Sequence, residues 1–411
     1  MKHTRALLGA SLVAASLVAA CSDGPAQGGQ SEALGQSQSA VIKGKASTAD
    51  QDAVVLLIHY ESSDPYGVGA CTGTMLSDRI VLTARHCVAA TDEAAACDEN
   101  GKPIQGGNVQ GNHKASSLYV FTGKTRPDFS RGDVNPAAQG SKILDTGSKT
   151  LCNSDIALVI LDKPIPNAKI APIRLESDVT KGEVITAVGW GVTDRTPQPD
   201  TRQQRTGIKV TGLGPDANAL PPVASNEFQV GESICSGDSG GPAIAETGAV
   251  IGVVSRGGNG RGGSSQDPSA NCIGAENIYT KVYPFKDLVM KAFQLTEAEP
   301  WIEGGPDPRL AIAGSPCTDA AECRSNLCIA DPGQAQATTC ATSCSESDCP
   351  EGQVCTVESD VKVCRSPEVA NKAKATTTTT SCATTPGAMG NGVVAFGLAM
   401  LGAVLVRRRR R

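Results

Sequence analysis

The stretch GDSGGP, residues 237–242, is the most informative in the chain. Gly, Asp, Ser and Pro all favour turns, so the plainest interpretation is a tight surface turn. The alternative is a backbone that glycine shapes so that the Ser239 hydroxyl stands free, with two amide N–H groups beside it. The surrounding sequence decides whether this stretch is a plain surface turn or one that presents a nucleophilic serine.

The composition excludes several classes of protein. The net charge is −5 over 411 residues, which argues against nucleic acid as a partner. The count of 16 cysteines is typical of an exported, oxidised protein rather than one of the reducing cytosol. No cofactor motif, calcium loop or phosphate-binding glycine loop stands out, so we expect neither a cofactor nor a metal.

Residues 1–20 have the pattern of a secretory signal peptide, with basic residues before an apolar run that ends in small residues. The sequence LVAAC, ending at Cys21, resembles a bacterial lipobox, in which the cysteine is lipidated and becomes the new N-terminus. The register of small residues and cysteine favours lipidation over an ordinary signal with an incidental cysteine. Residues 21–40, rich in Gly, Gln and Ser, are expected to be a disordered propeptide or linker.

Residues 384–411 form a second hydrophobic segment. Its apolar run, 387–406, is long enough to span a bilayer, and the arginines at 407–411 would hold that end in the cytoplasm. Following Cys382 and a Thr-rich stalk (365–383), the segment resembles the C-terminal sorting signal of myxobacterial surface proteins, in which the tail is cut and the protein is retained. A plain transmembrane anchor is the alternative. Both predict a protein of the cell envelope or cell surface, with release from it left open.

Residues 41–296 contain short β-rich runs such as AVVLLIHY (53–60) and DIALVIL (155–161), bounded by turn residues. This pattern predicts an all-β barrel or sandwich. One helical pattern, YPFKDLVMKAFQ (283–294), ends the region. Residues 97–150 are polar and are expected to be a looped-out insertion.

A linker (297–316) and a cysteine-dense module (317–364) follow. A stretch this short cannot build a large core and must be held by disulfides. Eight cysteines permit 105 pairings, and the sequence does not choose among them. Zinc is disfavoured because the stretch has no histidine. The cysteines are Cys317, Cys323, Cys328, Cys340, Cys344, Cys349, Cys355 and Cys364.

Three histidines lie between residues 41 and 296. His59 is inside an apolar strand and is expected to be packed, whereas His113 falls in the polar insertion and is expected to be exposed. His86, in LTARHCV (82–88), ends a strand beside a cysteine that can bridge to Cys71. His86 is therefore the candidate catalytic histidine.

Asp155 opens the apolar run DIALVIL, where an acid is either a strand-end cap or a shielded carboxylate that orients an imidazole. A serine hydroxyl is a weak nucleophile unless a base takes its proton, and an acid keeps that base in one tautomer. Ser239, His86 and Asp155 supply these three roles.

The motifs LTARHC (82–87), NSDIAL (153–158) and CSGDSGGP (235–242), in this order, resemble the trypsin–chymotrypsin family of serine proteases. The resemblance covers residues 41–296. It implies a double β-barrel with a C-terminal helix and a serine endopeptidase that acts on proteins or peptides through an acyl-enzyme. Ser239 would be the nucleophile, His86 the general base and then acid, and Asp155 its orienting partner. The N–H groups of Gly237 and Ser239 would form the oxyanion hole.

The sequence AVIKG (40–44) resembles the family's mature N-terminus. In that family a new apolar N-terminal residue buries its α-amino group against the acid before the serine, which implies Val41 and Asp238 here. Lys43 departs from the small residue usual at its place. The chain would then be a zymogen that an activating protease cuts after Ala40, rather than carrying an unprocessed linker. The cut would release the enzyme from a lipid on Cys21.

The resemblance also implies the disulfides Cys71–Cys87 and Cys235–Cys272, which leaves Cys97 and Cys152 as a candidate third pair. The other places where the chain departs from the family concern the substrate pocket. The pocket base would be Ser233, which is not an acid, so cleavage after Lys or Arg is not expected. The wall would run from Ser255 to Gly257, with Arg256 in place of the usual aromatic residue and Asn277 where glycine is common. A preference for small or medium neutral side chains follows.

Two alternatives remain. One is an inactive protease homologue, which the presence of all three catalytic residues disfavours. The other is a binding or adhesion protein whose function lies in residues 317–364.

Overall fold

The computed structural model describes residues 41–371 except for short gaps at 63–67, 93–94, 132–133, 195, 197, 262–266, 268, 331–336, 346–348 and 359–360. The expected signal peptide, Cys21, the propeptide, Cys382 and the C-terminal anchor segment lie outside the described residues. Within the described ranges, none of the helices combines the length and apolar character needed to cross a membrane.

The first barrel consists of β2 (Val54–Tyr60), β3 (Val68–Met75), β4 (Ile80–Thr83), β9 (Leu118–Phe121), β10 (Ala138–Asp145) and β11 (Ala157–Leu161). These antiparallel strands close in the order β10-β11-β4-β3-β2-β9. On β11, Ala157, Val159 and Leu161 pack in one core cluster, while the alternate residues Leu158 and Ile160 pack in another. Both faces of this strand are covered, which explains its continuous apolar run.

The second barrel consists of β12 (Val184–Gly189), β13 (Gln203–Leu213), β14 (Glu227–Val230), β15 (Pro242–Ala245), β16 (Val250–Gly258) and β17 (Glu276–Lys281). They follow the order β13-β12-β15-β16-β17-β14, and a further β13–β14 pairing closes the ring. The short strand β1 (Lys45–Ala46) flanks β13. The fold is the expected double barrel.

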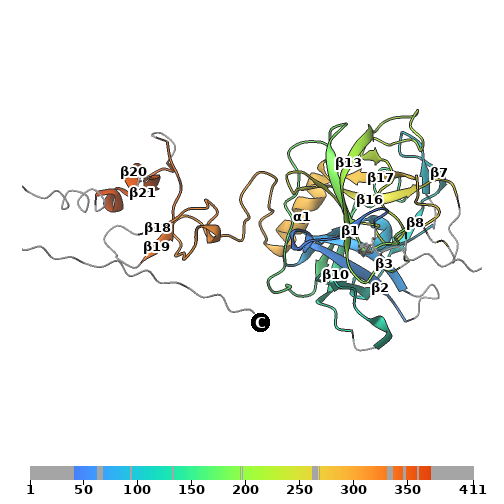
Figure 1. The fold of residues 1–411 in the computed structure, drawn as a ribbon, viewed down its shortest axis with the longest axis horizontal. Helices are drawn as coiled ribbons and strands as arrows, with labels where there is room; N and C mark the ends of the chain where they lie inside the picture. The colour runs from blue at the N-terminus through green and yellow to red at the C-terminus, as the bar shows by residue number, and fades with distance from the viewer. Residues whose placement is uncertain are drawn as a thin grey trace, which may run out of the picture. The chain divides into compact units, whose positions relative to one another are not determined.

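Helix α1 (Lys286–Thr296) follows β17 after a 3-10 turn at Tyr283–Phe285 (Figure 1). Its residues Val289 and Phe293 lie in a core cluster with Leu82 of the first barrel and Val253 of the second. The helix therefore shares one apolar core with both barrels, and the expected C-terminal helix is present. Other 3-10 turns lie at Ala49–Gln51, Arg85–Cys87, Ala115–Ser117, Phe129–Arg131 and Ala320–Glu322.

The expectation of a looped-out insertion over residues 97–150 is wrong in its extent, because β9 and β10 within it are strands of the first barrel. Strand β10 exposes or half-exposes most of its residues while Ala138, Gly140 and Leu144 are buried, so its mixed composition concealed it. The segment outside the barrel carries two small hairpins, β5 (Ala89–Thr91) with β8 (Val109–Asn112) and β6 (Ala95–Cys97) with β7 (Pro103–Gly106).

Residues 317–365 contain two further hairpins, β18 (Cys328–Ala330) with β19 (Thr338–Cys340) and β20 (Val354–Glu358) with β21 (Val361–Arg365). Each hairpin has its own pair of interlocking disulfides. The bridges are Cys317–Cys328 and Cys323–Cys340 in the first, and Cys344–Cys355 and Cys349–Cys364 in the second. The eight cysteines thus divide into two successive units of four.

Candidate active site

His86 and Asp155 meet in the first barrel because β4 and β11 pair in register, with Ala157 opposite Thr83. His86 lies on the 3-10 turn that follows β4, and Asp155 comes just before β11. Asp155 Oδ2 accepts a hydrogen bond from Nδ1 of His86 at 2.8 Å, and Oδ1 accepts one from the backbone N–H of His86 at 3.0 Å. The two bonds fix the imidazole ring and its backbone together.

Ser255 brings a third bond to Asp155 from the second barrel, donating from Oγ to Oδ2 at 2.7 Å. The pairing of β16 with β17 shifts register between Val254 and Arg256, which places an irregularity at Ser255. Such bulges redirect side chains beside functional sites. Ser255, expected in the pocket wall, thus turns its hydroxyl to Asp155.

The electrostatics of this pair depend on burial, because the Asp155 side chain is only 1% exposed and that of His86 20%. Burial alone would lower the pKa of His86, but the charge of Asp155 and its hydrogen bond outweigh burial and raise this pKa. Burial would raise the pKa of Asp155, but the charge of His86 and the bonds from His86 and Ser255 hold it below its usual range. Asp155 therefore stabilises the imidazolium form of His86, the form that results when the ring accepts a proton.

Ser239 lies on a segment that Thr72 of β3 holds against the first barrel. The Thr72 N–H donates to the carbonyl of Ser239 at 2.8 Å, and its hydroxyl donates to the carbonyl of Gly237 at 2.9 Å. The adjacent Cys71 is bridged to Cys87, the neighbour of His86. The serine of the second barrel and the histidine of the first are therefore fixed to the same strand.

Glycine is required on both sides of Ser239. Gly240 has a φ of +75°, and a Cβ there would lie 2.0 Å from the Thr83 hydroxyl oxygen. Gly237 has a φ of +96°, and a Cβ there would lie 2.8 Å from the Cα of Gly191. Within the described residues, neither the Gly237 N–H nor the Ser239 N–H donates a hydrogen bond. Both donors thus remain available for an anion.

Asp238 is fully buried, and it accepts hydrogen bonds from the N–H groups of Gly191 at 2.8 Å and Cys235 at 2.9 Å. Burial raises the pKa of Asp238 to about 7 against the lowering effect of these two bonds and of the Arg126 charge. Arg126 itself donates to the carbonyls of Trp190 and Pro199. Two neutral N–H donors therefore hold Asp238 in place, and the charge of Arg126 lowers its pKa less than either of them.

Val41 and Ile42 are buried on the second barrel. Ile42 packs in a cluster with Cys235 and Cys272, and the N–H of Cys235 is one of the two donors to Asp238. Val41 has a φ of 60°, a left-handed conformation that a β-branched residue rarely adopts. The start of the described chain is strained where cleavage was expected.

The expected pocket residues are close together on neighbouring strands. Asn277 lies opposite Gly257 in the β16–β17 pairing. The Asn277 Nδ2 donates to the Ser233 hydroxyl at 3.3 Å and to the Gly231 carbonyl at 3.0 Å. A Cβ on Gly257 would lie 2.0 Å from the Asn277 Oδ1. The amide of Asn277 therefore occupies space between Gly257 and Ser233.

The disulfides in this region join the cysteines that the sequence analysis paired: Cys71–Cys87, Cys97–Cys152 and Cys235–Cys272. Other contacts were not anticipated from the sequence. His113 is half-buried rather than exposed, because its ring stacks on His59 with centroids 3.6 Å apart. Thr72 carried no sequence signal, since its partner Gly237 lies 165 positions away.

Groups of cysteines with metal-ligand spacing occur at Cys71–His86–Cys87 and within residues 317–355. Each of these cysteines is in a disulfide, whereas a metal ligand would have to be a thiolate. They do not form a metal site in this oxidised state.

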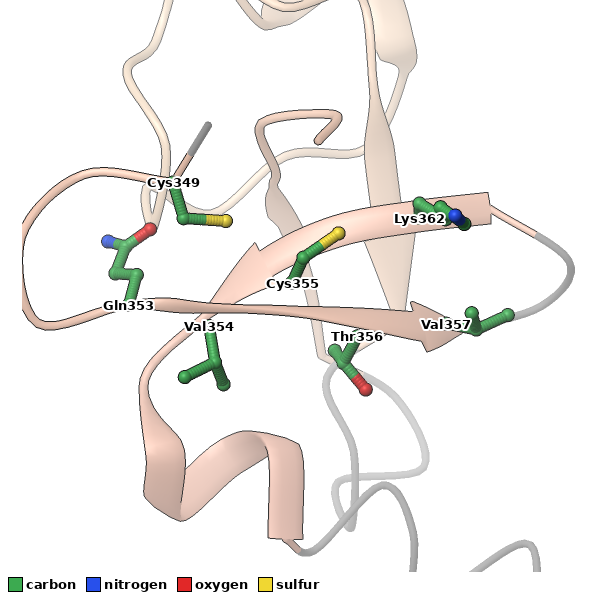
Figure 2. A pocket seen from close by; sticks show the side chains of 7 residues that line it. All are labelled: Cys349, Gln353, Val354, Cys355, Thr356, Val357 and Lys362. Carbon is green, nitrogen blue, oxygen red and sulfur yellow. The ribbon is translucent and has the colours of Figure 1, made fainter. Parts of the chain in front are cut away.

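A hollow of about 410 Å³ lies beside the β20–β21 hairpin. Figure 2 shows Val354 and Thr356 on one side of β20 and Cys355 on the other. Among the described residues that line the hollow, Lys362 is the only ionisable group apart from bridged cysteines. It offers no acid–base pair, so the candidate active site is the one between the barrels.

The sequence model of the family Trypsin matches residues 41–289. The chain belongs to the trypsin family. This trypsin-family chain is a serine endopeptidase, as expected, and its substrates are proteins.

Relatives of this trypsin-family chain include proteins of snakes and of a beetle. The thrombin-like enzyme elegaxobin-1 of Protobothrops elegans is 28% identical over 235 residues, 53% of this chain and 85% of the relative. The snake venom serine protease Haly-2 of Gloydius brevicauda is 28% identical over 261 residues, 60% and 85% respectively. A trypsin of Phaedon cochleariae is 27% identical over 231 residues, 53% and 77%.

Proposed function

We propose that Ser239 is the nucleophile of this endopeptidase, with His86 as general base and Asp155 as the residue that orients it. The bonds from His86 to Asp155, at 2.8 and 3.0 Å, carry the proposal. Because Asp155 engages Nδ1, the other ring nitrogen, Nε2, is the one left to take the serine proton.

In the proposed reaction the Ser239 oxygen adds to the carbonyl carbon of the scissile peptide bond while His86 accepts the hydroxyl proton. The electron pair of the carbonyl moves to its oxygen, where the N–H groups of Gly237 and Ser239 stabilise it. Collapse breaks the C–N bond, and His86 gives its proton to the leaving amine. Water then repeats the sequence on the acyl-enzyme and releases Ser239.

Labelling with a fluorophosphonate probe tests this assignment. Protein with a confirmed Val41 N-terminus should be labelled at Ser239, and the Ser239→Ala variant should not. Retained labelling in the variant would place the nucleophile elsewhere. Absence of labelling in both, at the correct N-terminus, would favour the inactive-homologue or binding-protein alternative.

Cleavage between Ala40 and Val41 is the proposed activation step, performed by an activating protease. Hydrolysis would create a Val41 ammonium group as a partner for the buried Asp238 and would remove the backbone restriction on the strained φ of Val41. The cut form should react with the probe much faster than the uncut chain, and Asp238→Asn should remove that advantage. Equal labelling of cut and uncut parent protein would contradict the zymogen proposal.

The proposed preference for small or medium neutral side chains rests on Asn277, whose amide fills space beside Gly257 and Ser233. Neither Ser233 nor Asn277 offers a charge to Lys or Arg. Profiling with a peptide library should find small residues before the cut in the parent protein and larger ones in Asn277→Gly. Asn100→Gly, on an exposed turn, is the control. An unchanged profile in Asn277→Gly would refute the assignment.

Export through the signal peptide 1–20, lipidation of Cys21 and attachment through residues 384–411 complete the proposal. Every cysteine within the described range 41–371 is already paired with another one there, so none remains to hold a cut propeptide through Cys21. Activation would therefore release the enzyme from its N-terminal lipid. Lipid label recovered on the mature fragment would contradict this.

A further inference from the structure

Glu227, the first residue of β14, is a buried acid that the proposed reaction does not use. Its side chain is 0% exposed, and Arg256 donates to both of its carboxylate oxygens at 2.7 Å. The backbone N–H groups of Asn153 and Ala224 donate to the same oxygens at 3.0 and 3.1 Å. Each oxygen thus accepts two hydrogen bonds, so neither oxygen of this buried carboxyl group lacks a partner.

These bonds connect Glu227 to two segments that contact or lead into Asp155. Asn153 lies two positions before Asp155 in the first barrel. Arg256 lies one position after Ser255 in the second barrel, and Ser255 donates to Asp155 at 2.7 Å. One carboxylate therefore fixes the segment that leads into Asp155 and the strand that supplies its third hydrogen bond.

The contact with Asn153 is reinforced from the same loop of the second barrel. The N–H of Asn226 donates to the Asn153 Oδ1 at 2.6 Å, and the Asn226 Nδ2 donates to the Asn153 carbonyl at 3.1 Å. Asn153 itself has a φ of 64°, a left-handed conformation that asparagine tolerates better than most residues. Three bonds thus hold this turn across the barrel interface in one conformation.

We propose that Glu227 and Arg256 are a positioning pair that keeps the Asp155 carboxylate aligned with His86. The inference rests on the proposed catalytic roles of Asp155 and His86. A forked guanidinium–carboxylate pair fixes direction as well as distance. Arg256 is thereby given a role at the place where the sequence lacked the usual aromatic residue.

The test uses the activated enzyme and its variants Glu227→Gln and Arg256→Met, singly and combined. Rates are measured on p-nitrophenyl acetate, a small ester without a peptide chain, and on a peptide. A misplaced Asp155 slows both substrates alike, and we expect kcat to fall by roughly 10²-fold in each single variant. The double variant should be impaired little more than either single one, because the two residues act as a unit.

The pH profile distinguishes a positioning role from a merely structural one, because only displacement of Asp155 should shift it. Asp155 raises the pKa of His86, so a looser Asp155 should shift the acidic limb of kcat/KM to lower pH. In the described part of the chain, the Arg85–Asp145 pair beside His86 is left intact by these substitutions. The matched control is Glu303→Gln, which disrupts the two-pronged pair between the Arg174 guanidinium and the Glu303 carboxylate. It should change neither kcat nor the acidic limb of kcat/KM.

Unchanged ester hydrolysis and an unmoved acidic limb, with only a higher KM for the peptide, would overturn the proposal in favour of substrate docking. Where Glu227→Gln or Arg256→Met does not fold, Arg256→Lys is judged by the same criteria, because it keeps the charge and loses only the fork. Fluorophosphonate labelling of the parent reports on the proposed function separately. A labelled parent with an unaffected Glu227→Gln variant refutes the positioning pair alone.

Discussion

Replacing Thr72 with valine tests how the first barrel holds the glycine-rich segment of the second. The substitution keeps the shape of the side chain and removes one hydroxyl. That hydroxyl donates to the Gly237 carbonyl at 2.9 Å and accepts from the Trp190 N–H at 3.2 Å. Thr72 is 0% exposed, so water cannot replace either bond.

The magnitude follows from these two bonds. Each contributes about 1 kcal/mol, and a buried backbone group left without a partner costs about 1–3 kcal/mol. We expect the free energy of unfolding to fall by about 2–4 kcal/mol in Thr72→Val, and Tm to fall by roughly 5–15 °C. Because Gly237 is also a proposed oxyanion donor, kcat/KM should fall by roughly tenfold or more, up to the 10²–10³ of losing that donor altogether.

Thr74→Val is the matched control, on the same strand and equally buried. Its hydroxyl has no hydrogen-bond partner within the described residues, so the same substitution should leave stability and kcat/KM nearly unchanged. Thermal unfolding and peptide hydrolysis are measured for both variants side by side. Equal losses in the two variants would contradict the prediction, since the effect would then come from valine in β3 and not from the Thr72 bonds.

Three further predictions concern the acid, the insertion and the zymogen. Ser255→Ala removes a donor that lowers the pKa of Asp155, and the more basic carboxylate then holds the His86 proton more tightly. We expect kcat to fall by roughly tenfold and the acidic limb of kcat/KM to move to higher pH; a pH profile identical to the parent's would contradict this. Replacing Cys97 and Cys152 with alanine opens a bridge that spans 55 positions and should lower the free energy of unfolding by up to about 4 kcal/mol in urea titration, and an undiminished stability would speak against it. In the uncut chain, the raised pKa of Asp238, about 7, lets the folded state keep a proton that the unfolded state loses near pH 4, so stability should fall as pH rises between these values. Asp238→Asn should remove that slope, and a parent whose Tm does not change across this range would refute the prediction.

Much of the barrel fold could be predicted because the signals are local. Strands such as β11 are predicted by their apolar content and bounding turn residues, and helix α1 is predicted by its periodicity. Strand β10 was missed because its outward residues are polar and its sequence reads as a loop. The bridges of residues 317–364 could not be predicted, because spacing does not select among pairings.

The candidate site divides in the same way. His86, Asp155 and Ser239 are each found within a short motif, and the structure brings the first two into contact. Thr72 and Glu227 belong to no motif, because the partners that relate them to the site are distant in sequence: Gly237 lies 165 positions from Thr72, and Arg256 and Asn153 lie 29 and 74 positions from Glu227. The bonds from Thr72 to Gly237 and from Asn153 to Glu227 exist only once the two barrels have packed together, whereas the fork from Arg256 to Glu227 forms within the second barrel.

The seven disulfides of residues 71–364 are arranged strictly in chain order. The first three close separate, non-overlapping loops, and overlap occurs only inside the units 317–340 and 344–364. Among the described cysteines, none pairs with a cysteine of a later unit. A chain that emerges N-terminus first can therefore oxidise each unit as it appears, without breaking an early bridge to form a late one.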